Sequence, residues 1–324
     1  MELISLWALQ IMMFLLMAAG AVMAKTGILK PEGKGILTDA VLYFFLPCNI
    51  VNSFRMEFSM EILKKFALCL VIASLIQVIC YLLSRVLYNH KSKEIRQVMQ
   101  YCTLVSNSGF LGMPIAEGIF GAEGLMYAAV FIVPTRIVMW TEGVSCFTQS
   151  PDMRSVLKRL MLHPCIIAVE AGLALLVFQA PLASLYEKII NGGIAPVSAL
   201  ASVLLVATDK AVRSAGGCTT ALTMVLIGMM MADVRGKDML DRNVALITGL
   251  RLALLPAIVW AGCRLAQIDP LITGIAVVIT GMPAGSTSAI LAAKHGCDYK
   301  FATRCIVVST FLSLFSVPLW RMIL

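Results

Sequence analysis

The sequence predicts an all-α integral membrane protein with ten transmembrane helices in two inverted five-helix repeats, the fourth helix of each repeat being broken. Three observations predict this fold class. The 324 residues are 60% hydrophobic and only 14% charged, and their mean hydropathy is +0.90. Apolar segments close to the roughly 20 residues that span a bilayer recur along the whole chain. The triplet Gly-Met-Pro occurs at residues 112–114 and 281–283, in one such segment of each half.

Ten apolar segments are the predicted helices. The first repeat, residues 1–160, contains helices one to five at 3–24, 36–54, 62–88, 99–120 and 123–148. The second repeat, residues 161–324, contains helices six to ten at 161–180, 214–233, 242–264, 270–293 and 300–322. Because each repeat has an odd number of helices, the two halves must insert with opposite orientations.

Residues 181–213 do not fit this pattern. Their apolar run of roughly 15 residues is shorter than an ordinary span. We interpret them as an atypical connecting segment, amphipathic or re-entrant, with an extra span as the alternative. An extra span would invert the second half and remove the charge bias between the two sides.

The basic residues predict the orientation in the membrane. With an outside N-terminus, 16 Lys and Arg residues fall on the inner side and 8 on the outer side, while Arg136 and Arg251 lie within helices. The positive-inside rule then predicts a multi-pass cell membrane protein, surrounded by lipid, with both termini outside. The formal charge of +8 is spread over short loops, so no nucleic-acid partner is expected. The ten cysteines include no C-x-x-C pair, and neither a metal site nor another cofactor is expected.

Each Gly-Met-Pro triplet is predicted to break its helix. Proline has no N–H to bond and clashes with the preceding turn, so we expect each proline at the first position of a second half-helix. The amides that follow would be left unbonded, and their partial positive charge would attract an anion. The predicted binding residues are Ser106, Asn107, Ser108, Gly112, Pro114 and Ile115 in helix four, and Gly281, Pro283, Ala284, Gly285, Ser286 and Thr287 in helix nine.

One kinked helix would be ordinary packing, because Gly and Pro are frequent in membrane helices. Two breaks at matched places in the halves favour a transporter's binding site instead. The free amides are expected after Pro114 at Ile115 and Ala116, and after Pro283 at Ala284 and Gly285.

Charged residues inside predicted helices are costly in lipid and are candidates for function. Arg136 is further from its helix ends than Arg251, so we expect it to matter more, paired with Glu117, Glu142, Glu170 or a substrate carboxylate. For each arginine the alternative is a structural role, by snorkelling or by capping a carbonyl. Glu117 is the candidate for binding a coupling H⁺ or Na⁺, or else only a partner of a helix dipole.

The remaining polar residues are given simpler roles. Asn49 and Asn52 either line the cavity or hydrogen-bond between helices. His163 marks a helix start, and His295 is interpreted as an inert loop residue.

Several motifs together resemble the auxin efflux carrier family, whose members include plant PIN proteins and bacterial malate or malonate permeases. They are Leu46-Pro47, Asn107 to Pro114, His163-Pro164, Cys218 to Asp233 and Gly281 to Ser288, and the resemblance covers nearly the whole chain. It implies ten helices in two inverted repeats, with helices four and nine unwound where they cross. It also implies organic anion substrates in contact with Asn107, Pro114 and Pro283. The chain departs from the family at Thr219-Thr220, where proline is frequent.

The predicted function is secondary active transport of a small organic anion, such as malate, malonate or an auxin-like acid, by alternating access. The alternatives are a Na⁺-coupled symporter like the bile acid carriers, a Na⁺/H⁺ exchanger of similar architecture, and a channel or sensor. The sequence has no ATP-binding loop and no hydrolase or metalloprotease motif, so neither ATP coupling nor an enzyme is expected. H⁺ or Na⁺ is the expected coupling ion, and the oligomeric state is left open, with a homodimer as one candidate.

Overall fold

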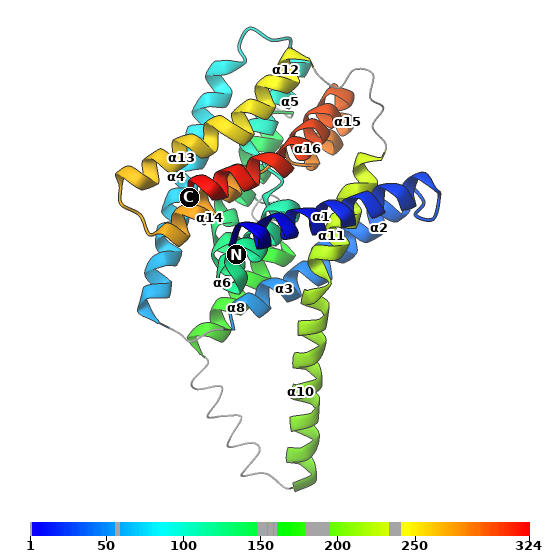
Figure 1. Cartoon of the computed structure of the whole chain (residues 1–324), viewed down its shortest axis with the longest axis vertical. Helices are drawn as coiled ribbons and strands as arrows, with labels where there is room; N and C mark the ends of the chain where they lie inside the picture. Colours follow the sequence, from blue (N-terminus) through cyan, green and yellow to red (C-terminus); the bar gives the residue numbers. More distant parts are fainter. Residues whose placement is uncertain are drawn as a thin grey trace.

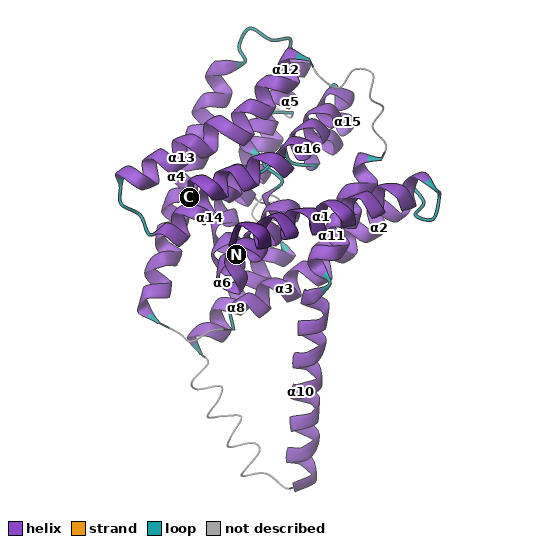
Figure 2. Cartoon of the chain, viewed as in Figure 1, coloured by secondary structure: helices purple, strands orange, loops and turns teal. Residues whose placement is uncertain are grey.

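The computed structural model describes residues 2–55, 59–147, 154, 158, 161–178, 195–232 and 241–324. This part of the chain is helical and contains no strand, as Figure 2 shows. Six helices are long and apolar enough to cross a membrane: Gly33–Ser53, Met60–Leu87, Ser108–Gly143, Ser202–Met231, Arg242–Leu265 and Tyr299–Ile323. Three shorter apolar helices lie at Ile11–Lys25, Pro164–Val177 and Pro270–Thr280. The all-α membrane class is therefore confirmed.

The first half of the chain contains α-helices joined in places by single π-helical turns. Its elements are α1 (Glu2–Lys25), α2 (Gly33–Ala40), η1 (Val41–Phe45), α3 (Leu46–Ser53), α4 (Met60–Leu87), α5 (Lys93–Leu104), η2 (Ser108–Gly112), α6 (Met113–Val138) and η3 (Met139–Gly143). The boundary predicted between residues 120 and 123 falls at Gly121, which interrupts α6 with a φ of +69°. A left-handed φ of this kind is accessible mainly to glycine.

The second half begins with α8 (Pro164–Val177). It continues with α10 (Ala195–Gly217), α11 (Thr219–Met231), α12 (Arg242–Gly249), η5 (Leu250–Leu254), α13 (Leu255–Leu265), α14 (Pro270–Thr280), α15 (Thr287–Lys294) and α16 (Tyr299–Ile323). Within the predicted connecting segment 181–213, the residues from 195 onward form the first part of α10. Residues 181–194 lie outside the described part.

Three prolines in the long helices are accommodated by π turns. The turns η1, η2 and η5 each come directly before a helix whose second residue is proline, at Pro47, Pro114 and Pro256. A helical proline clashes with the carbonyl four residues earlier, and the wider π turn moves that carbonyl away. These helices therefore continue through their prolines.

Helices α1 and α11 pack closely side by side (Figure 1). A side chain on Gly20 of α1 would overlap the carbonyl oxygen of Val225, and one on Gly228 of α11 would overlap the carbonyl oxygen of Met17. Small residues let membrane helices approach this closely. The two helices are thus in contact backbone to backbone.

Candidate functional site

Two unwound segments pair with each other at the centre of the site. Helix α5 ends at Leu104 and η2 begins at Ser108, while α14 ends at Thr280 and α15 begins at Thr287. Ser106 and Ala284 form an antiparallel bridge between the gaps. The Asn107 N–H donates to the Pro283 carbonyl at 2.8 Å, and the Gly285 N–H donates to the Val105 carbonyl at 3.0 Å. We call residues 105–107 and 283–285 the crossing.

The crossing satisfies backbone groups of both unwound segments. Irregular backbone at membrane depth is stable only where protein or a wet cavity surrounds it. Here each unwound segment bonds the other, and the Ala284 N–H donates to Ser309 Oγ on α16 at 3.1 Å. Glycine leaves room for this approach: a side chain on Gly285 would meet the Val105 carbonyl oxygen at 3.1 Å.

The break in helix four lies earlier in the chain than predicted. The second half-helix was expected to begin at Pro114. The second half-helix starts at Ser108, and the Asn107 carbonyl accepts the Leu111 N–H at 3.0 Å and the Gly112 N–H at 3.3 Å. Ile115 and Ala116 are well inside this helical run, so the prediction that their amides are free is wrong. The amides without an intrahelical partner are those of the first turn, from Ser108 to Phe110.

The break in helix nine also differs from the prediction. Pro283 lies in extended backbone and not at a helix start, and the amides of Ala284 and Gly285 are both hydrogen-bonded. The second half-helix begins at Thr287, whose hydroxyl is 2.7 Å from the Tyr101 hydroxyl on α5. The anion-attracting helix end therefore lies four residues further along the chain.

The two Gly-Met-Pro triplets are neighbours in space. A side chain on Gly112 would meet Met282 Cγ at 3.0 Å, so glycine is needed for the two broken helices to come this close. Gly281 follows the last residue of α14. The structure thus brings the predicted residues of helix four and helix nine together, while Pro114 and Ile115 belong to a continuous helix beside them.

Arg251 binds the carbonyl ends of both broken helices. Its Nη1 donates to the Thr103 carbonyl at 3.0 Å, its Nη2 to the Thr280 carbonyl at 3.0 Å, and its Nε to the Met282 carbonyl at 3.1 Å. Only 3% of Arg251 is exposed. A cation at the negative ends of two helices offsets their dipoles. The guanidinium caps carbonyls, which was the structural alternative for this residue.

Arg136 is half-buried, so Arg251 and not Arg136 is the more deeply enclosed arginine. The Arg136 guanidinium lies against Gly109 in the first turn of η2, where a side chain on Gly109 would overlap Nη2. The predicted pairing with Glu117, Glu142 or Glu170 is wrong, because Arg136 forms no ion pair among the described residues; pairing with a substrate carboxylate stays a prediction. Glu142 pairs with Arg85 at 3.3 Å instead.

Glu117 is half-buried on α6. Its Oε2 accepts a hydrogen bond from Asn49 Nδ2 on α3 at 2.9 Å. Asn52 donates to the Val212 carbonyl of α10 at 3.0 Å. Both asparagines thus bond between helices.

His163 caps the start of α8, and its Nδ1 accepts the Cys165 N–H at 3.3 Å.

A cavity of about 190 Å³ opens beside the crossing. It is lined by Lys34, Asn107, Ile227, Met230, Met231, Ser286, Ala289, Ile290, Thr303, Ile306, Val307 and Thr310. Asn107 and Ser286 come one from each break. Asn107 is 6% exposed, and its carboxamide has no hydrogen-bond partner among the described residues. Among the described residues, one lysine, three hydroxyls and one carboxamide line an otherwise apolar space, and none of the described lining residues is acidic.

Sequence reasoning missed three of the five polar residues of this lining. Lys34 belongs to α2 and had been counted only as an inner loop charge. Thr303 and Thr310 lie on α16, seven residues apart and on the same face as Ile306 and Val307. That spacing was a detectable signal, because residues three, four and seven apart share a helix face.

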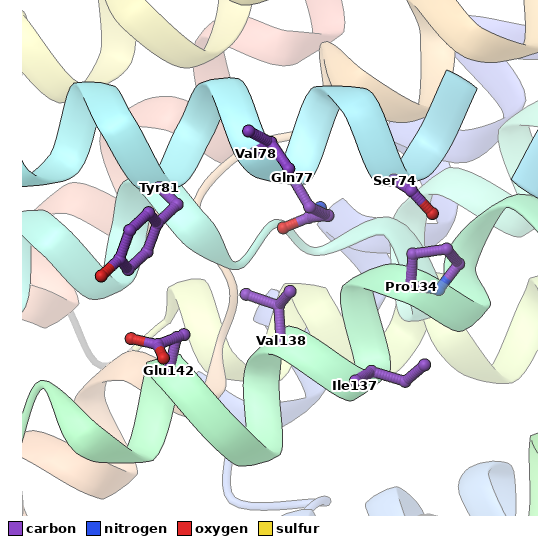
Figure 3. A pocket seen from close by; sticks show the side chains of 8 residues that line it. All are labelled: Ser74, Gln77, Val78, Tyr81, Pro134, Ile137, Val138 and Glu142. Atoms are coloured by element: carbon purple, nitrogen blue, oxygen red, sulfur yellow. The ribbon is translucent and has the colours of Figure 1, made fainter. Parts of the chain in front are cut away.

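A larger cavity of about 350 Å³ lies between α4 and the α6–η3 helix (Figure 3). Its lining residues Val78 and Ile137 are 54% and 40% exposed, so it opens on the outer surface. Gln77 within it is held by Thr135, to which its Nε2 donates at 2.8 Å. Neither unwound segment contributes to this cavity. The smaller cavity at the crossing is therefore the candidate site.

Comparisons with known proteins cover nearly the whole chain. Residues 8–162 and 152–321 match the family described as membrane transport protein. An uncharacterized transporter of Methanothermobacter thermautotrophicus is 25% identical over 313 residues, which are 95% of each chain. An uncharacterized transporter of Methanocaldococcus jannaschii is 24% identical over 307 residues, which are 92% of each chain.

Proposed function

This chain belongs to the membrane transport protein family, the auxin efflux carrier family that its sequence resembles, and we propose that it is a secondary transporter for a small organic anion. The observation that carries the proposal is the cavity in which Asn107 and Ser286 of the two breaks meet Lys34. A transporter's substrate must contact the parts that rearrange, and both unwound segments contribute to this cavity.

The charge of the cavity favours an anion. The described residues of its lining include the ammonium of Lys34 and no carboxylate. The unbonded amides at the start of η2 follow Asn107 directly and add partial positive charge. A Na⁺/H⁺ exchanger would need an acid here, but Glu117 lies outside the lining and is bonded to Asn49. A carboxylate could accept hydrogen bonds from Asn107, Ser286 and the threonines.

The size of the cavity favours a small substrate. A volume of about 190 Å³ corresponds to roughly six water molecules at about 30 Å³ each. Drug-sized ligands usually occupy about 300 Å³ or more. The proposed substrates are therefore short mono- or dicarboxylates such as malonate or malate, flanked by the apolar side chains of α11, α15 and α16.

The proposed mechanism is alternating access in the cell membrane, with ten helices in two inverted repeats and both termini outside. Substrate would bind at the crossing, and one part of the helix bundle would move against another to open the cavity to each side in turn.

A thermal-shift screen of purified protein in detergent tests the substrate class. Binding of a carboxylate to the folded state raises the unfolding temperature by mass action, and ligand at 100 times its Kd adds about 2.7 kcal/mol. We expect stabilisation by short carboxylates, absent with amines and sugars. Proteoliposomes preloaded with unlabelled malonate should then accumulate labelled malonate by counterflow. Stabilisation by amines alone, or flux that neither saturates nor counterflows, would reject the proposal.

A further inference from the structure

We propose that Arg251 is the fixed cation of the crossing: its guanidinium occupies the carbonyl site that a coupling metal ion would need, so that transport does not depend on Na⁺. The inference rests on the proposed function, in that it assigns the coupling of the same site.

The three acceptors of Arg251 form one site made from two distant parts of the chain. The Thr103 carbonyl belongs to the last turn of α5, the Thr280 carbonyl is the last of α14, and the Met282 carbonyl lies in the unwound segment. In transporters with broken helices, unwound carbonyls and C-terminal half-helix ends are the groups that coordinate Na⁺. The residues of such a cation site are therefore present here, and a side chain fills it.

The three carbonyl acceptors match the geometry of a guanidinium group. Arginine presents donors in a rigid planar fork, and here three of its nitrogens each reach a different carbonyl at 3.0–3.1 Å. Arg251 is 3% exposed and forms no ion pair among the described residues. Its charge is therefore balanced by carbonyl oxygens and helix ends, the same groups that would balance a metal ion.

A metal ion could not share this site. With an effective dielectric constant of about 20, two like charges about 4 Å apart repel enough to weaken binding on the order of a thousandfold. The guanidinium also occupies the space between the three oxygens. Since Arg251 cannot lose its proton or leave, the charge of the crossing stays constant through the transport cycle.

The first test uses the unmodified protein. Its unfolding temperature should be the same in NaCl and in choline chloride of equal ionic strength, and malonate uptake into proteoliposomes should be equal in the two salts. Specific stabilisation by Na⁺, or uptake that needs Na⁺, would overturn the inference. The comparison of unfolding temperatures needs no substrate, so it tests the inference even if the protein transports no carboxylate. Failure to transport any carboxylate would defeat only the proposed function.

The second test removes the charge. Arg251→Ala should lose malonate uptake, and millimolar guanidinium chloride should restore part of it, whereas choline chloride should not. Arg251→Lys should retain partial activity, because one ammonium cannot bond three separated carbonyls equally well. Arg85→Ala is the matched control, since Arg85 pairs with Glu142 at an exposed site, and it should transport normally with or without guanidinium. Full uptake by Arg251→Ala without guanidinium would overturn the assignment; if this variant does not fold, the Na⁺ comparison decides.

Discussion

Replacing Asn107 with alanine should separate ligand binding from the integrity of the crossing. The backbone of residue 107 carries the structural bonds: its N–H donates to Pro283 at 2.8 Å, and its carbonyl accepts from Leu111 at 3.0 Å and Gly112 at 3.3 Å. The carboxamide has no partner among the described residues, so its removal leaves no protein group unsatisfied. The substitution should therefore spare the fold and remove one contact to the substrate.

The expected magnitude follows from the charge of that substrate. A hydrogen bond to a charged group contributes about 1.5–3 kcal/mol, which corresponds to roughly a 10- to 150-fold increase in Kd. Titration calorimetry with malonate measures this directly. The unfolding temperature without ligand should stay close to that of the unmodified protein.

The matched control is Asn52→Ala. Unlike the Asn107 carboxamide, the Asn52 carboxamide bonds between helices, to the Val212 carbonyl at 3.0 Å, and Asn52 is not part of the cavity lining. It should lower stability by about 1 kcal/mol and leave Kd unchanged. If Asn107→Ala binds malonate as tightly as the unmodified protein, or lowers stability without affecting Kd, Asn107 is not a substrate ligand.

Three further substitutions test the site, the packing and the orientation. Lys34→Gln should weaken malonate binding by roughly tenfold because it removes the cation of the cavity, while Lys30→Gln in the exposed loop should not change Kd. Gly228→Leu should prevent stable accumulation of protein, because the new side chain would overlap the backbone of α1. Gly249→Ala should be tolerated, because there is open space around Gly249. The unfolding temperatures of the two variants in detergent test this difference. A cysteine in place of His90 should resist a membrane-impermeant thiol reagent added to intact cells, and labelling from outside would contradict the outside placement of both termini.

Many of the helices could be predicted from the sequence because length and apolarity are local properties, but α10 lies mostly in what was expected to be a connecting segment. Helix ten, for example, was expected at 300–322 and is found at Tyr299–Ile323. The boundary at Gly121 was equally visible, since a glycine between two apolar runs favours a change of direction.

The position of the breaks could not be predicted from proline alone. Pro114 follows the π turn η2, which removes the clash between the proline ring and the carbonyl of the preceding turn. The chain therefore unwinds at Ser106 and Asn107 instead. Serine and asparagine side chains compete with helical hydrogen bonds, and this weaker signal was the informative one. The partners of Arg251 had no local signal, because the Thr103 and Thr280 carbonyls lie far apart in the sequence.

The bridge between Ser106 and Ala284 also sets a condition on how the protein is made. The two segments that it joins are separated by about 180 residues of chain. At synthesis rates of about 5–20 residues per second, the second segment follows the first by roughly 10–40 s. If residues 105–107 entered the membrane during that interval, they would lack their native backbone partners, and each unbonded group there would be costly. Residues 99–120 would then hold another conformation, either as an unbroken helix or held by an insertase, until residues 283–285 are in place to pair with them.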